Sequence, residues 1–196
     1  MYAGGGADVV TVTGDEASNV FGEGGDDRLF ANNAGSLLDG GSGEDVLIGG
    51  SGSDTLVGGS GNDVLNAGAG MDTLDGGQGV DQINAGSGSD VITGGAGDDT
   101  IDGGAGNDTL AMGAGGIDSI DGGAGDDSVT LTGLTKDDTV AGGAGSDTLI
   151  TAAAIAYDDE ATPTAIDVGI NISGFEVFRN TAEVSQDMAA LDGIVA

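Results

Sequence analysis

The chain contains no cysteine, no histidine and no tryptophan, and only one proline. Without cysteine and histidine it can form no disulfide, has few ways to bind zinc, and lacks the usual nucleophiles and general bases of enzymes. We therefore expect no enzymatic activity and no catalytic residue. No run of about 18 apolar residues is present, so we also expect no membrane span.

Basic residues are almost as scarce. Arg28, Lys136 and Arg179 stand against 34 acidic residues, which gives a formal net charge of −31. Phosphate groups are bound mainly by lysine and arginine, so nucleic acid is excluded as a partner. No basic residue precedes Arg28, so we expect no cleaved secretory signal peptide. High charge with only six aromatic residues would by itself indicate disorder.

Glycine is abundant, with 43 residues, and it recurs in a nine-residue pattern. Eight consecutive units cover Gly40 to Ala111, beginning GGSGEDVLI, GGSGSDTLV and GGSGNDVLN. Looser copies, some lengthened to ten or eleven residues, extend the register to sixteen units between Ala3 and Ile150. The eighth residue is aliphatic in all sixteen units, which a disordered chain has no reason to maintain. The periodicity therefore argues against permanent disorder.

Each unit combines a six-residue glycine-rich turn with a three-residue β-favouring segment such as VLI. The middle residue of that segment points away from its two neighbours, so we expect the aliphatic residue to face a core. Nine extended residues reach only about 30 Å, too short to enclose a core between two sheets about 10 Å apart. Two units can do so, which predicts coils of 18 residues. One aliphatic residue per strand gives only a small hydrophobic core. A further interaction must therefore stabilise the turns.

The sixth position is aspartate in fourteen units and serine at Ser18 and Ser36. In an 18-residue coil these carboxylates would stack along two edges and repel one another unless cations lay between them. Ordinary aspartate–glycine turn chemistry is the alternative, but it does not require aspartate in phase over a hundred residues. A flexible site with oxygen ligands only is what Ca²⁺ prefers. We therefore expect several Ca²⁺ ions, each shared between units n and n+2.

The candidate metal ligands are the sixth-position carboxylates Asp45, Asp54, Asp63, Asp72, Asp81, Asp90, Asp99, Asp108, Asp127 and Asp147, with Asp8, Asp27, Asp118 and Asp138 from the less regular units. Turn carbonyls are the other expected donors, from Gly41, Gly43, Gly50, Gly52, Gly59, Gly61, Gly68, Gly70, Gly77, Gly79, Gly86, Gly88, Gly95, Gly97, Gly104 and Gly106.

This pattern resembles the RTX (repeats-in-toxin) family, whose repeat is G-G-x-G-x-D-x-U-x with U a large aliphatic residue. The resemblance implies an all-β, right-handed parallel β-roll of about eight coils with Ca²⁺ in its turns. It also implies export by a type I secretion machinery through an uncleaved C-terminal signal. The chain departs from the pattern at Ser18, Glu23 and Ser36, and in the lengthened units 112–121 and 131–141.

The composition changes after the last unit. We expect a calcium-binding β-roll over residues 1–150, most regular over 40–111, and a β-rich capping segment over 151–196 that continues into a longer parent protein. Alternation at Ile166, Val168, Ile170 and Ile172, followed by Phe175, Val177 and Phe178, predicts two strands covering the last coil. Residues 181–194 fit either a short helix or another coil. The phrase SGFEVF resembles segments that follow RTX repeats in bacterial surface-layer and adhesin-like proteins.

Two function classes remain open. One is a calcium-binding structural module of a secreted or cell-surface protein, which folds on meeting extracellular calcium. The other is the β-roll of an exported enzyme or toxin whose catalytic domain lies elsewhere. The expected location is extracellular, and the expected partners are calcium, further copies of the module or the rest of a parent chain. An ice-binding face is disfavoured, because the third and fifth positions are irregular.

Overall fold

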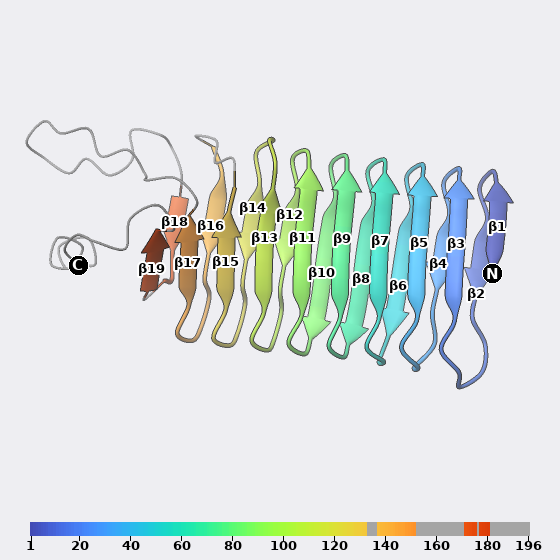
Figure 1. The fold of residues 1–196 in the computed structure, drawn as a ribbon, viewed down its shortest axis with the longest axis horizontal. Coiled ribbons are helices and arrows are strands. Elements are labelled where there is room, and N and C mark those ends of the chain that lie inside the picture. The colour runs from blue at the N-terminus through green and yellow to red at the C-terminus, as the bar shows by residue number, and fades with distance from the viewer. Residues whose placement is uncertain (133–136, 152–170, 176, 181–196) are drawn as a thin grey trace, which may run out of the picture.

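In a computed structural model of the chain, residues 1–132, 137–151, 171–175 and 177–180 are described. These residues form strands joined by turns and contain no helix. The strands lie in two parallel sheets that face each other (Figure 1). One sheet contains β1 (Tyr2–Gly5), β3 (Asn19–Gly24), β5 (Leu37–Ser42), β7 (Thr55–Ser60), β9 (Thr73–Gln78), β11 (Val91–Ala96), β13 (Thr109–Gly113), β15 (Ser128–Leu131), β17 (Thr148–Thr151) and β19 (Val177–Asn180). The other contains β2 (Val9–Thr11), β4 (Arg28–Phe30), β6 (Val46–Gly50), β8 (Val64–Ala69), β10 (Gln82–Ser87), β12 (Thr100–Asp102), β14 (Ser119–Asp121), β16 (Thr139–Ala141) and β18 (Asn171–Ser173).

Neighbouring strands of a sheet are one full coil apart in the sequence. Leu38 of β5 pairs with Leu56 of β7, 18 residues later. The lengthened units stretch this spacing without breaking the register: Ile120 of β14 pairs with Val140 of β16. The fold is therefore a parallel β-solenoid of about eight turns, which confirms the all-β, 18-residue coil expected from the period.

The strands are longer than the three residues expected. In β5, β7 and β9 the strand spans six residues, because it continues through the first three positions of the following unit. Gly41 pairs with Gly59, for example. The expectation of a six-residue turn is therefore wrong for these units: three glycine-rich positions belong to the sheet, and the turn keeps only the fourth to sixth positions.

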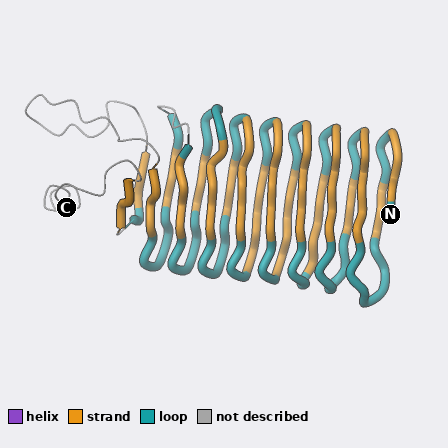
Figure 2. The backbone as a smooth tube through the Cα atoms, viewed as in Figure 1, coloured by secondary structure: helices purple, strands orange, loops and turns teal. Residues whose placement is uncertain are grey.

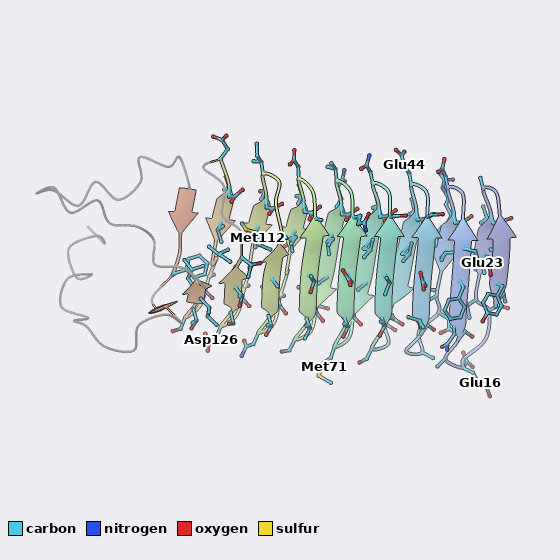
Figure 3. The ribbon with its side chains drawn as sticks, turned by 45° about the horizontal axis from the view of Figure 1, so that its top comes forward. Glu16, Glu23, Glu44, Met71, Met112 and Asp126 are labelled. Carbon is cyan, nitrogen blue, oxygen red and sulfur yellow. The ribbon has the colours of Figure 1, made fainter. Side chains whose placement is uncertain are left out.

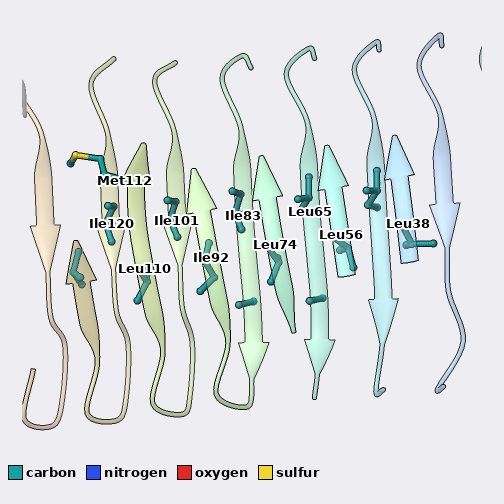
Figure 4. Packing of buried hydrophobic residues seen from close by; sticks show 14 of the residues in the cluster. Leu38, Leu56, Leu65, Leu74, Ile83, Ile92, Ile101, Leu110, Met112 and Ile120 are labelled. Atoms are coloured by element: carbon teal, nitrogen blue, oxygen red, sulfur yellow. The ribbon is translucent and has the colours of Figure 1, made fainter. Parts of the chain in front are cut away.

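The core is a single cluster of side chains that both sheets contribute (Figure 4). The eighth-position residues from Val20 to Leu149 are all buried, as expected, and Val10 is partly buried. The first position also faces inward, because strand alternation places it two residues after the eighth. Ala67, Ala85 and Met112 occupy this position and are buried.

Two strands of the expected cap are described. β18 pairs with β16 and β19 pairs with β17, both in parallel, so they extend the two sheets beyond the last repeat unit. Phe175, between them, is 8% exposed and belongs to the core cluster. The expected alternation at Ile166, Val168 and Ile170 and the segment 181–194 lie outside the described residues.

Candidate metal site in the turns

The turns form two rows, one along each edge of the solenoid (Figure 2). We call the first edge the row of turns that contains Asp27, Asp45, Asp63, Asp81, Asp99, Asp118 and Asp138, and the second edge the row that contains Asp54, Asp72, Asp90, Asp108, Asp127 and Asp147. Glu44 lies at the first edge, and Met71 and Asp126 lie at the second (Figure 3). The predicted division of the aspartates between two edges is therefore present.

Along each edge the aspartates are joined by a regular ladder of hydrogen bonds. The backbone amide of each aspartate donates to Oδ1 of the aspartate one coil further on, at 2.7–2.9 Å. The ladder reaches the irregular units too: Asp8 donates to Asp27, Asp118 to Asp138 and Asp127 to Asp147. All the predicted aspartates thus occupy equivalent places in the turns.

Asp63 shows which of its polar atoms the ladder leaves without a hydrogen-bond partner. Its amide donates to Asp81 Oδ1, its carbonyl accepts from Gln82 N, and its Oδ1 accepts from Asp45 N. Its Oδ2 is buried and has no hydrogen-bond partner. The same holds, within the described residues, for Oδ2 of Asp27, Asp45, Asp54, Asp72, Asp81, Asp90, Asp99, Asp108 and Asp127. A buried carboxylate oxygen without a partner is costly, so each points to a missing positive group.

In the units that begin with glycine, the first position leaves room beside this oxygen. A Cβ on Gly58 would lie 2.5 Å from Asp63 Oδ2 and 2.5 Å from the carbonyl oxygen of Gly76, one coil further on. A Cβ on Gly103 would likewise lie 2.6 Å from the carbonyl oxygen of Gly122 and 2.9 Å from Asp108 Oδ2. A carboxylate oxygen and a carbonyl oxygen of successive coils therefore converge on one small space, which fits a hard cation with oxygen ligands.

The carbonyls predicted as ligands, at the second and fourth positions, point along the solenoid axis. The Gly43 carbonyl lies where a Cβ of Gly61 would be, and Gly61 itself has a φ of 132°. Only glycine adopts such a backbone without strain. Carbonyls of the second position already accept one backbone hydrogen bond from a neighbouring coil: Gly86 O accepts from Ala105 N, and Gly104 O accepts from Ala124 N. Each keeps one lone pair for a further ligand.

Burial raises the pKa of these carboxyl groups. Loss of water is the largest cause, and neighbouring aspartates add to it, whereas the amide hydrogen bond at Oδ1 acts in the opposite direction. The pKa of Asp54, Asp63, Asp108 and Asp118 rises to about 6. The pKa is also raised at Asp45, Asp72, Asp81, Asp90, Asp99 and Asp127. With a pKa of about 6, Asp54, Asp63, Asp108 and Asp118 are mostly ionised at neutral pH, which favours a bound cation.

The described residues bring no three acidic side chains together into a ready-made metal cluster. Carboxylates from successive coils are separated by backbone, so carbonyls must supply most of the oxygens at each site. The first-position carbonyls, such as Gly76 O, are candidate oxygen ligands that sequence reasoning missed. The side-chain pattern carried no signal for them, because strand alternation fixes the direction of side chains and not that of carbonyls.

The irregular units keep the ladder but change the space around it. Ser36 replaces an aspartate, and its Oγ accepts from Ser18 N at 3.2 Å. In the two lengthened units the first position holds Met112 and Leu131, both buried in the core cluster. These two units therefore carry a large apolar side chain where most other units have glycine or alanine.

A family model described as "RTX calcium-binding nonapeptide repeat (4 copies)" matches residues 21–56, 39–74, 48–83, 75–110, 111–133 and 130–153. Together these matches cover residues 21–153, more than half of the chain. The chain belongs to the RTX calcium-binding repeat family. No curated protein matches it.

Membership of the RTX family confirms the expected resemblance. RTX repeats bind Ca²⁺, and the chain is accordingly an RTX β-roll with calcium-binding repeats. The described part of the chain contains no helix long and apolar enough to cross a membrane.

Proposed function

We propose that this RTX β-roll is a structural, non-catalytic module of a secreted or cell-surface bacterial protein of the surface-layer or adhesin kind, and that it folds on meeting extracellular calcium. The observation that supports this most directly is the set of ten buried Oδ2 atoms without a partner, in phase along both edges. A structural turn would have no reason to bury so many unpaired carboxylate oxygens.

Each site combines donors from two successive coils. The Oδ2 of an aspartate such as Asp63 and the first-position carbonyl of Gly76 face one space, and both are proposed ligands. The sixth-position aspartates of both edges play this role, together with the second- and fourth-position glycine carbonyls named above. Asp8, Asp118 and Asp138 share the ladder and are proposed ligands on that ground.

The electrostatics make folding depend on the cation. A net charge of −31 and two rows of buried carboxylates oppose formation of the roll at neutral pH. Bound calcium supplies the positive charge that offsets this repulsion. The binding free energy then becomes folding free energy. Extracellular calcium modules work at about 10⁻⁴–10⁻³ M, far above cytosolic levels, so the chain stays unfolded inside the cell and exportable by a type I machinery.

Far-ultraviolet circular dichroism of the full chain tests this proposal. In excess chelator we expect a disordered spectrum, and on titration to millimolar Ca²⁺ a cooperative gain of β signal. Mg²⁺ at the same concentrations should give much less, because it demands tight octahedral geometry. Equal β content in chelator and in calcium would contradict the proposal. Calcium-induced sheets or filaments in electron micrographs would support the surface-layer setting.

A further inference from the structure

A second ladder of hydrogen bonds runs beside that of the aspartates, built from the side chains of the fifth position. Asn62 Oδ1 accepts from Val80 N at 2.8 Å, and Asn107 Oδ1 accepts from Asp126 N at 2.9 Å. The same contact joins Asp26 to Glu44 N, Ser53 to Met71 N, Ser89 to Asn107 N, Asp98 to Ile117 N and Asp126 to Ser146 N. The family pattern leaves this position unspecified.

The two ladders run in opposite directions along the roll. Val80 N donates back to Asn62 in the preceding coil, whereas the next amide, Asp81 N, donates forward to Asp99 in the following coil. A turn with both contacts is therefore held from both sides. Its sixth-position carboxylate cannot shift along the axis without breaking one of the two bonds.

The second ladder requires a short side chain that carries an oxygen. Val80 has none, so it offers no acceptor to the next coil, and Met71 offers only a weak sulfur acceptor. On the second edge Ser89, Asn107 and Asp126 follow one another, and the ladder runs without a gap from Ser89 to Ser146.

We propose that the fifth-position oxygen side chains are positioning residues for the calcium sites: each holds the turn of the following coil where its aspartate Oδ2 meets the carbonyl of the next coil. This rests on the proposed calcium-dependent folding and adds the residues that set the register of its ligands. The fifth position thereby tunes calcium affinity coil by coil, without contacting the ion.

Asn107→Val tests this inference, with Asn107→Asp as the conservative variant and Met71→Val as a control at the same position and edge. In calcium-saturated protein, hydrogen exchange of the Asp126 amide should be about 2- to 12-fold faster in Asn107→Val, the range expected for one net hydrogen bond. The calcium concentration at half-folding should rise by about 1.2- to 2-fold, because one bond is shared among several ions. Asn107→Asp should restore both values, and Met71→Val should change neither.

Val80→Asn is the reciprocal variant, since it supplies an acceptor where the chain has none. It should slow exchange of the Asp98 amide and lower the calcium midpoint. Unchanged midpoints in Asn107→Val and Val80→Asn, beside a normal calcium response of the unaltered chain, would overturn the inference alone, even if amide exchange changed. Absence of any calcium response in the unaltered chain would instead overturn the proposed function, and the positioning role with it.

Discussion

Asp45 N donates to Oδ1 of Asp63 at 2.8 Å, a full coil further along the chain, while Oδ2 of Asp63 is buried and unpartnered. One oxygen of the carboxylate thus serves the backbone and the other is left for a cation.

Asp63→Asn separates the two oxygens. The amide retains an oxygen for Asp45 N but removes the negative charge beside Gly76 O. In saturating calcium we expect a loss of about 1.5–3 kcal/mol in unfolding free energy, as for a hydrogen bond to a charged group, and one ion fewer by calorimetric titration. Asp75→Asn, on the exposed face of β9, should change stability by less than about 0.5 kcal/mol. Equal effects of the two substitutions would contradict a ligand role for Asp63.

Gly61→Ala tests the backbone. Gly61 has a φ of 132° and lies against the Gly43 carbonyl. An added methyl group would therefore strain the backbone and clash with that carbonyl oxygen. We expect a loss of at least about 1–3 kcal/mol, measured by urea unfolding in calcium. Gly5→Ala is the matched control, because a Cβ there has no atom within 4 Å. A stable Gly61→Ala protein would show that the turn backbone differs from the one described.

Glu23→Gly should stabilise the roll. Glu23 has a φ of 74° at the second position, where glycine stands in the regular units. Removing the strain of a non-glycine residue in the left-handed conformation should raise the free energy of unfolding by about 1–2 kcal/mol. Thermal unfolding in calcium would measure the gain. Glu16→Gly removes the same charge from an exposed turn and should not reproduce it; a similar rise in both variants would assign the effect to charge instead.

Acid should favour the calcium-free fold. The pKa of Asp54, Asp63, Asp108 and Asp118 is about 6 in the folded chain, against an ordinary value of 3.8 for an aspartate. A raised folded-state pKa means that the folded chain binds protons more tightly. This contribution to stability is fully present below pH 4 and is lost as pH rises through about 6. In calcium-free buffer, β signal should therefore increase as the pH falls from 7.5 to 5. A constant or falling signal would contradict it.

The sequence predicted the coil because period and side-chain direction are both local properties. Leu56 and Leu74 repeat in phase, and a β-strand fixes which way each one points. The inward first position was harder to see, because glycine occupies it in most units and carries no side chain to mark a face. Ala67 and Met112 were the visible clues.

The candidate site was predicted only in part for a similar reason. Residue types show that Asp63 carries two oxygens, but not that Asp45 N uses one of them. That contact depends on the axial offset between coils, which only the assembled sheets define. The role of Asn62 was hidden for the same reason, since its partner is the amide of Val80 and any residue type except proline could supply it.

The 18-residue coil also has a mechanical consequence. Each coil advances the axis by only about 4.8 Å, yet pulled straight it releases about 60 Å of chain. Tension along the axis would thus unfold the roll one coil at a time and lengthen it more than tenfold. Calcium concentration would set the force at which each loop yields, making the module an extensible tether whose stiffness is governed by the surrounding medium.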